Sequence, residues 1–270
     1  YKIGTAGAWQ DWALSLDPSQ KSKLFTGAVP GKTYYFRTRA RDRAGNVEPY
    51  PAMADVYVSI DPLLNGDFEQ GSWLGWERSG VCQPTQVITQ SYSGGTTHAV
   101  VLGCPDQKNG APVGASMVCQ TIAIPNAQDM PAPMLYFRYR IFTYDVLWSQ
   151  RYHRFYDSFN VGWGPPGEIE PTWVFTDGNR TQIYDQLMDL GWREGAIDLK
   201  PYAGQTIKIC LANVTRVDEY FNTWTVVDDI RLVNLERKLY LPIVLRDTRA
   251  AGQLVKVYQN SVYPELKAKR

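Results

Sequence analysis

The chain has 270 residues, of which 44% are hydrophobic, and its 28 basic and 27 acidic residues leave a net charge of +1. A nearly neutral chain lacks the broad positive surface of proteins that bind nucleic acids or anionic membranes, so we expect neither partner. No apolar run approaches the roughly 20 residues of a membrane-spanning helix, so we expect no membrane span.

The composition predicts an all-β protein. Nine tryptophans, 17 tyrosines, 17 prolines and 22 glycines occur with short alternating runs bounded by turn residues, which is typical of strands joined by tight turns. The only helix candidate of note lies around Ile183 to Leu190.

The first long strand in the sequence starts at Tyr34. Apolar and polar residues alternate from there to Arg41, the pattern of a half-buried antiparallel strand, and Asp42 to Asn46 supply a turn. The outward phase carries a basic stripe, interpreted either as a solvated strand face or as a partner site: Arg37, Arg39 and Arg41.

The stretch GKTYYFRTRARDRAGN, residues 31–46, resembles the F strand and F–G turn of bacterial fibronectin type III domains. The resemblance implies that Tyr34 makes a tyrosine-corner hydrogen bond. Residues 1–60 would then be a partial fibronectin type III sandwich whose first two strands are absent, which leaves Phe36 and Val58 uncovered. The other strands expected in this region lie around Tyr1 to Trp12, Lys23 to Thr26 and Val56 to Ile60.

After the break at Asp61 and Pro62, a second set of short strands runs over residues 63–235. Seven or eight strands bounded by Gly, Pro, Asn or Asp predict a sandwich or jelly roll. An opening NGDFE, an IP followed by an LxFxYxI strand, a DLxxYAGQ turn and a closing DD-aliphatic strand occur in that order. This order resembles the galactose-binding-like jelly rolls of carbohydrate-binding modules and of accessory domains in bacterial secreted peptidases such as the immune inhibitor A group.

Residues 236–270 resemble neither domain and form a C-terminal extension. An apolar segment at Leu239 to Arg246 is followed by an alternating segment at Gln253 to Gln259. Two arrangements remain open: the tail packs on its own jelly roll, or it completes the sandwich of another copy and causes self-association.

Four cysteines lie in the second region, at positions 82, 104, 119 and 210, and their spacing fits no CxxC metal or redox motif. An even number favours two disulfides, for which three connectivities exist. Cys119 and Cys210 are both out of phase with the apolar residues of their strands, so both point away from the main core. The preferred pairing is therefore Cys119 with Cys210 and, by subtraction, Cys82 with Cys104.

Four carboxylates at the two ends of the second region form the best candidate metal site: Asp67, Glu69, Asp228 and Asp229. The first and last strands of a jelly roll commonly lie near one another, and converging carboxylates with backbone carbonyls suit Ca²⁺. The resemblance implies a structural calcium held by Glu69 and an aspartate of the closing pair. Two other interpretations stay open: a loop stabilised by ordinary hydrogen bonds, and an acid–base pair of a glycoside hydrolase.

The strand Met134 to Phe142 predicts the ligand site. One phase is apolar and belongs to the core, whereas the other presents Tyr136, Arg138 and Arg140, with Trp173 expected in a nearby loop. Sugars are recognised by flat aromatic rings beside planar hydrogen-bonding groups, so these four residues are candidates for glycan binding. Aromatic packing without a ligand is the alternative.

Together these patterns predict a non-catalytic, secreted or cell-surface adhesion module of a bacterial protein that binds glycan or a cell-surface polymer. The chain has two histidines and no GxSxG motif, so we expect no enzyme activity. The alternatives are an accessory region of a larger secreted hydrolase and a structural subunit of a surface layer or filament.

Overall fold

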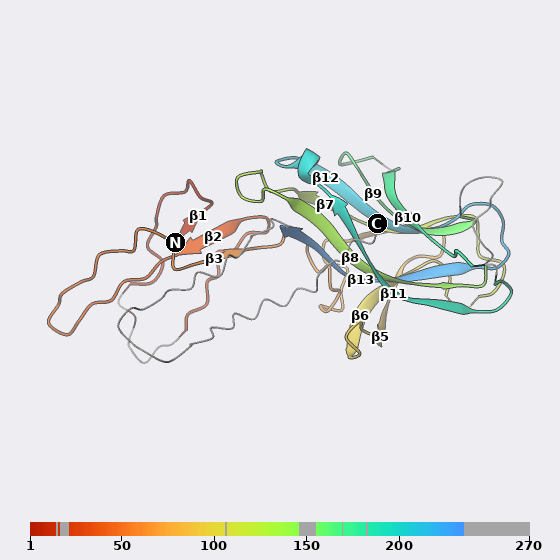
Figure 1. The fold of residues 1–270 in the computed structure, drawn as a ribbon, viewed down its shortest axis with the longest axis horizontal. Coiled ribbons are helices and arrows are strands. Elements are labelled where there is room, and N and C mark those ends of the chain that lie inside the picture. The colour runs from red at the N-terminus through yellow and green to blue at the C-terminus, as the bar shows by residue number, and fades with distance from the viewer. Residues whose placement is uncertain are drawn as a thin grey trace, which may run out of the picture. The chain divides into compact units, whose positions relative to one another are not determined.

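The computed structural model describes residues 1–14, 16, 22–105, 107–145, 155–168, 170–181 and 183–234. In this part the chain forms one three-stranded sheet and two five-stranded sheets (Figure 1), which confirms the all-β prediction. The C-terminal extension, with its two expected segments, lies outside the described residues. Within the described residues, no helix is long and apolar enough to cross a membrane.

The N-terminal region contains the three-stranded sheet. Strands β1 (Lys2–Ile3), β2 (Thr33–Phe36) and β3 (Val56–Ser59) are antiparallel and lie in the order β1-β2-β3. Tyr34 is buried; its hydroxyl donates to the Gly27 carbonyl (3.0 Å) and accepts from the Val29 amide (2.9 Å). These are the upstream backbone bonds expected of a tyrosine corner, whereas membership of the fibronectin type III family stays a prediction.

Three local predictions for this region meet different outcomes. The turn forms, since the Asp42 amide donates to the Asn46 carbonyl and the Gly45 backbone has φ +94°. The long strand is shorter than expected: β2 ends at Phe36, and only an isolated bridge joins Arg41 to Val47. The expected strand at Lys23 to Thr26 is wrong, because that segment pairs with no neighbouring strand and its Phe25 serves as a packing ring instead.

A cluster of aromatic rings covers one face of this sheet. The Phe36 ring lies 5.3 Å from Phe25 and 5.7 Å from Trp12, centroid to centroid, and Tyr1 joins the same cluster. Phe36 is therefore half-buried rather than uncovered, whereas Val58 on the edge strand is 45% exposed as expected.

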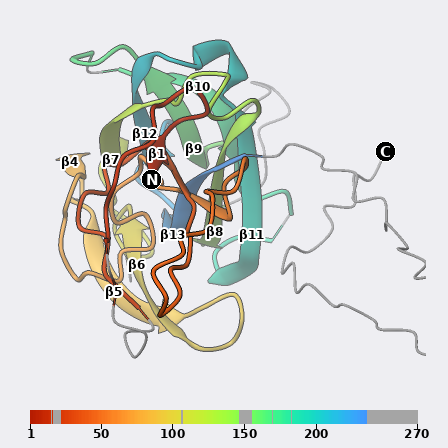
Figure 2. The same cartoon turned by 90° about the vertical axis from the view of Figure 1, so that its left-hand side faces the viewer.

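Ten strands form the second region, in two sheets that lie one above the other (Figures 1 and 2). The first sheet has the order β10-β9-β12-β7-β4 and the second β11-β8-β13-β6-β5, the arrangement of a jelly-roll sandwich. Strands of the first sheet are β4 (Glu77–Gly80), β7 (Gly114–Ala123), β9 (Asp157–Gly164), β10 (Thr172–Asp177) and β12 (Thr206–Thr215). Those of the second are β5 (Thr85–Gln90), β6 (Thr96–Leu102), β8 (Pro133–Thr143), β11 (Met188–Asp198) and β13 (Thr223–Asn234).

The helix predicted around Ile183 to Leu190 is wrong. This segment ends in the first residues of β11, which pairs with β8 from Met188 to Asp198 except at an irregularity between Asp189 and Trp192. The only helical element among the described residues is a single 3₁₀ turn at Lys200–Tyr202. Pairing with a neighbouring strand has overridden a helix-like spacing of apolar residues, as tertiary contacts often do over so short a window.

Buried and half-buried residues alternate along β8, and the buried ones show where the core lies. Leu135, Phe137, Tyr139 and Ile141 are buried between the sheets, while the intervening residues are half-buried on the outer side. The core leaves no space beside Phe137, because a Cβ added at Gly195 on β11 would lie 2.3 Å from its ring. This position requires glycine for close approach and not for backbone conformation.

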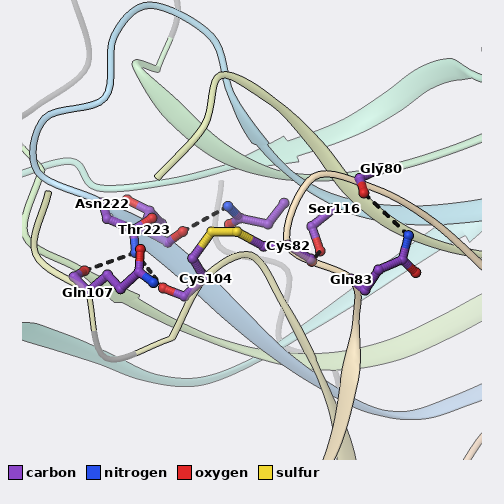
Figure 3. Close-up of a disulfide and its surroundings, with 9 residues drawn as sticks. Gly80, Cys82, Gln83, Cys104, Gln107, Ser116, Asn222 and Thr223 are labelled. Atoms are coloured by element: carbon purple, nitrogen blue, oxygen red, sulfur yellow. Dashed lines mark hydrogen bonds between the residues drawn. A yellow bond between two sulfur atoms is a disulfide. The ribbon is translucent and has the colours of Figure 1, made fainter. Parts of the chain in front are cut away.

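Both disulfides form with the predicted pairing, Cys119–Cys210 and Cys82–Cys104. Cys119 lies directly opposite Cys210 in the β7–β12 pair, with Cα atoms 4.2 Å apart, a spacing close to that of a non-hydrogen-bonded antiparallel pair. Figure 3 shows the other bridge, where Ser116 donates to the Cys82 carbonyl (2.6 Å) and Asn222 donates to the Cys104 carbonyl. This bridge thus joins the loop between β4 and β5 to the loop after β6, and the hydrogen bond from Asn222 attaches the segment that leads into β13 to the same place.

Candidate functional site

The outward phase of β8 gathers the candidate ligand residues on one surface. Tyr136, Arg138 and Arg140 are half-buried on the outer side of the second sheet, as predicted. Each has a register partner on the neighbouring strand β11, which adds Trp192 beside Arg140 and Glu194 beside Arg138. We call this surface the β8 face; it consists of Tyr136, Arg138, Arg140, Phe142, Trp192 and Glu194.

Arg138 is held in place from several sides. Its guanidinium lies 3.3 Å from Glu194 and 3.3 Å from Asp229, its Nε donates to the Tyr136 hydroxyl (3.0 Å), and its Cζ lies 4.5 Å from the centre of the Tyr92 ring. Burial is the main cause that raises the pKa of Tyr136 to about 12. The phenol therefore stays protonated over the physiological range and keeps a hydroxyl group at this surface.

The other end of the face combines aromatic rings with a second fixed guanidinium. Arg140 forms a two-pronged ion pair with Asp189, and its Cζ lies 5.0 Å from the centre of the Phe142 ring. Phe142 in turn stacks on Trp224, with centroids 5.6 Å apart and planes 9° apart. The hydrogen bond from Arg140 lowers the pKa of Asp189, so this pair remains charged. The result is a set of planar groups in fixed orientations.

The structure does not bring Trp173 to this surface. The residue lies on β10, the edge strand of the first sheet, and not in a loop near β8 as predicted. Because the core separates the two sheets, Trp173 cannot contribute to the same site as Tyr136, Arg138 and Arg140.

Two of the four predicted metal ligands come together. The Thr97 hydroxyl on β6 lies 2.8 Å from Glu69 Oε1 and 3.0 Å from Asp228 Oδ2, so both carboxylates converge on one residue. His98 binds the other Glu69 oxygen through Nδ1 (2.9 Å), and this hydrogen bond is the main cause that lowers the pKa of Glu69 to about 2. Burial raises the pKa of Asp228 to about 6.

The other two carboxylates have different partners. A bulge in β13 between Asp228 and Arg231 places Asp229 at φ +52° and directs its carboxylate to Arg138 and Arg231 (3.3 and 3.4 Å). Bulges of this kind redirect side chains near functional sites. Asp67 accepts from the Glu69 amide at 3.3 Å. Asp229 therefore joins the acidic residues to the β8 face, a connection that the sequence did not reveal.

Two carboxylates and one hydroxyl are the oxygen ligands that this arrangement offers to a calcium ion. No group of three or more His, Cys, Asp or Glu side chains in the described part of the chain is arranged to hold a metal ion. Glu69, Asp228 and the Thr97 hydroxyl do present hard oxygen atoms at one point, and Ca²⁺ would need further oxygens from backbone carbonyls or water to reach six to eight ligands. The calcium site stays a prediction.

The hydrolase interpretation of the same residues loses support. A glycosidic bond must fit between the acid and the base, but Thr97 lies between the Glu69 and Asp228 carboxylates and binds both.

Comparisons with known proteins identify no family for this chain. No protein family model matches the sequence, and neither does any curated protein. Among solved structures, the chain is similar to TmCBM61 in complex with β-1,4-galactotriose, at 17% identity and a TM-score of 0.39, over 65% of this chain and 99% of that one. It is also similar to the K3 adhesin domain of Lys-gingipain from Porphyromonas gingivalis, at 15% identity and a TM-score of 0.40, over 63% of this chain and 95% of that one.

A third neighbour is a CBM28 module specific for non-crystalline cellulose, at 16% identity and a TM-score of 0.37, over 64% of this chain and 96% of that one. At these levels of identity and TM-score the likeness identifies no ligand. The sandwich architecture rests instead on the strand order and register of the chain itself.

Sequence reasoning missed two aromatic residues of the β8 face, Phe142 and Trp192, which pack against a buried cluster that contains Trp224. Phe142 shares the phase of Tyr136, Arg138 and Arg140 and was recognisable from the alternation alone. Trp192 and the buried Trp224 lie beside β8 only because β11 and β13 flank it. That strand order is not encoded in the local pattern.

Proposed function

We propose that the chain is a non-catalytic extracellular module that binds glycan through the β8 face. The observation that carries the proposal is the association of half-buried aromatic rings, Phe142 and Trp192, with the fixed guanidinium groups of Arg138 and Arg140. Pyranose rings offer C–H patches and a rim of hydroxyls, which match flat aromatic surfaces beside planar donors and acceptors.

The ion pairs favour a neutral ligand. Arg140 is paired with Asp189, and Arg138 is paired with both Glu194 and Asp229. Each guanidinium is therefore balanced by a carboxylate, and the surface presents donors and acceptors in similar numbers. Sugar hydroxyls use both kinds of group.

The two disulfides support a location outside the cytoplasm. Disulfides persist in oxidising compartments and are rare where thiols are kept reduced, and all four cysteines of the chain are paired. Secretion or display at the cell surface, with a role in adhesion, is therefore part of the proposal.

The proposal includes a structural calcium ion at Glu69 and Asp228. Binding to the folded state alone would stabilise the protein by about 2.7 kcal/mol at a hundredfold excess over Kd. Calcium should therefore raise the melting temperature of the wild type and leave that of Asp228→Asn almost unchanged. Equal melting curves for the wild type with calcium and with chelator would remove calcium from the proposal.

Glycan binding is tested with an array of neutral oligosaccharides, followed by calorimetry on any ligand found. Trp192→Ala should weaken binding by roughly 5- to 150-fold, because the loss of a stacking ring costs on the order of 1–3 kcal/mol of binding free energy. Trp173→Ala on the opposite sheet is the matched control and should bind as the wild type does. Loss of binding in the control but not in Trp192→Ala would move the site to the first sheet.

The same array separates the alternatives. A structural subunit of a layer or filament would bind no glycan and would assemble in light scattering of the full chain, for which self-association through residues 236–270 remains a prediction. An accessory region of a larger hydrolase would bind glycan as proposed here, and its parent activity would appear only in the intact polypeptide.

A further inference from the structure

The N-terminal region carries a second surface of distinct chemistry, on the face of its sheet opposite the aromatic cluster. The Arg37 guanidinium lies between two rings, with Cζ 4.0 Å from the centre of Trp9 and 4.5 Å from that of Tyr50. The Cζ atom of Arg39 lies 4.1 Å from the centre of the Tyr50 ring, and the Nζ atom of Lys2 lies 5.4 Å from the centre of the Trp9 ring. We call this set the cation–aromatic stack; it consists of Lys2, Trp9, Arg37, Tyr50 and Arg39.

Among the described residues, none of these cations forms an ion pair with a carboxylate. Every ion pair among the described residues joins side chains of the second region, between positions 69 and 231. The nearby carboxylates have other donors: Asp55 accepts from the Thr38 amide (2.6 Å), and Glu48 accepts from the Ala40 amide (3.1 Å). Asp11 contacts the stack itself, where it accepts from the Tyr50 hydroxyl (3.4 Å). The described residues up to position 60 include seven basic and four acidic residues, so this region has an excess of positive charge.

We propose that the cation–aromatic stack binds an anionic polysaccharide, with sulfate or carboxylate groups on the guanidinium edges. A guanidinium that stacks face-on still directs N–H groups outward in its own plane, and this edge matches the two oxygens of a carboxylate or sulfate. Arg37 donates one of these groups, on Nη1, to the Pro51 carbonyl (3.1 Å), so the ligand would meet its remaining N–H groups and those of Arg39. The rings fix the orientation of the cations before the ligand arrives, which lowers the entropy cost of binding. Repeated cations along one face suit a linear polymer with repeated anions.

Nucleic acid fits this surface less well. Single-stranded nucleic acids use aromatic rings as platforms for their bases, but the rings of Trp9 and Tyr50 are already covered by guanidinium groups. The bases of a nucleic acid would therefore find no open ring to stack on, and the guanidinium edges would bind only the anionic groups of a polymer. This second site is independent of the β8 face, where the arginines are paired and the proposed ligand is neutral.

The experiment measures the affinity of the full chain for dextran sulfate and polygalacturonate, with neutral dextran as the control polymer. Arg39→Gln should weaken binding roughly tenfold, the value of one charge-assisted hydrogen bond. Lys200→Gln is the matched variant, because it removes the same charge from an exposed position of the second region and should change the affinity by less than about twofold. Binding to both anionic polymers should weaken with added salt.

Tyr50→Leu tests the stack without changing the charge. It removes the ring shared by Arg37 and Arg39, so we expect weaker binding at unchanged net charge. Equal losses in Arg39→Gln and Lys200→Gln would show that only net charge matters and would overturn the proposal. So would an absence of binding to both anionic polymers, full retention of binding by Tyr50→Leu, or equal affinity for an oligothymidylate of the same length.

Discussion

The two regions of the molecule stabilise their aromatic and cationic side chains in different ways. In the jelly roll, the rings of Phe137, Tyr139 and Phe159 lie between two sheets, and most arginines have carboxylate partners. The N-terminal region has a single sheet among the described residues. One of its faces is covered by rings, and the other holds arginines on rings. A region without a second sheet thus uses side-chain stacking in place of sheet packing.

The largest expected effect tests the closed architecture of the jelly roll. Replacing both Cys119 and Cys210 with alanine should lower its free energy of unfolding by on the order of 4–5 kcal/mol, because the bridge closes a 91-residue separation. The corresponding change at Cys82 and Cys104, 22 residues apart, should cost about 3 kcal/mol. Denaturant unfolding of both variants gives the comparison, and equal losses would contradict the loop-length argument.

The packing between the two sheets is tested by Gly195→Ala. The added methyl group would overlap the Phe137 ring. Overpacking of this kind lowers the free energy of unfolding by about 1–3 kcal/mol. Gly95→Ala is the control, because a Cβ there meets only the Ser91 hydroxyl at 3.7 Å. If both variants melt at the wild-type temperature, the core is less tightly packed than described.

The junction between the two regions is sensitive to pH. Burial raises the pKa of Asp61 from 3.8 to about 6, while its carboxylate accepts from the Leu63 and Leu232 amides. The folded state binds the proton more tightly than the unfolded state, so this stabilisation is complete below about pH 4 and disappears as the pH rises through 6.

Asp61→Asn removes this titration. The stability of the wild type relative to the variant should increase by about 2 kcal/mol between pH 7 and pH 4. Urea unfolding at both pH values measures the difference, in which the other titrating groups cancel. Parallel stability curves for the two proteins would contradict the raised pKa.

The smallest effect concerns the N-terminal region. Tyr34→Phe removes the hydroxyl that forms hydrogen bonds with the Gly27 carbonyl and the Val29 amide. The substitution should lower the free energy of unfolding of this region by about 1–2 kcal/mol. The loss should appear in the local protection of residues 27–36 from hydrogen exchange, with the jelly roll unchanged. A change that extends into the jelly roll would show that the two regions unfold together.

Local patterns were enough to predict some features of the fold and the site. The alternation of β8 placed Tyr136, Arg138 and Arg140 on the outer side, and the phase of Cys119 and Cys210 led to the correct disulfides. Both predictions use the two-residue period of a strand, which can be read directly from the sequence.

Features that depend on strand order or on contacts between distant loops could not be predicted. Trp173 was assigned to the wrong surface because nothing local shows which sheet a strand joins. The contacts of Arg37 with Trp9 and Tyr50 connect residues far apart in sequence. The diversion of Asp229 towards Arg138 depends on a bulge that becomes visible only once β13 is paired with β8.

The two disulfides also determine how the chain would respond to mechanical tension. A crosslink removes the residues between its cysteines from the length that pulling can extend, and the separations of 22 and 91 residues do not overlap. At about 3.4 Å per extended residue, the larger bridge alone withholds roughly 300 Å of contour length. A module anchored at one end and attached to a polymer would therefore stay short under load even after its sheets had separated.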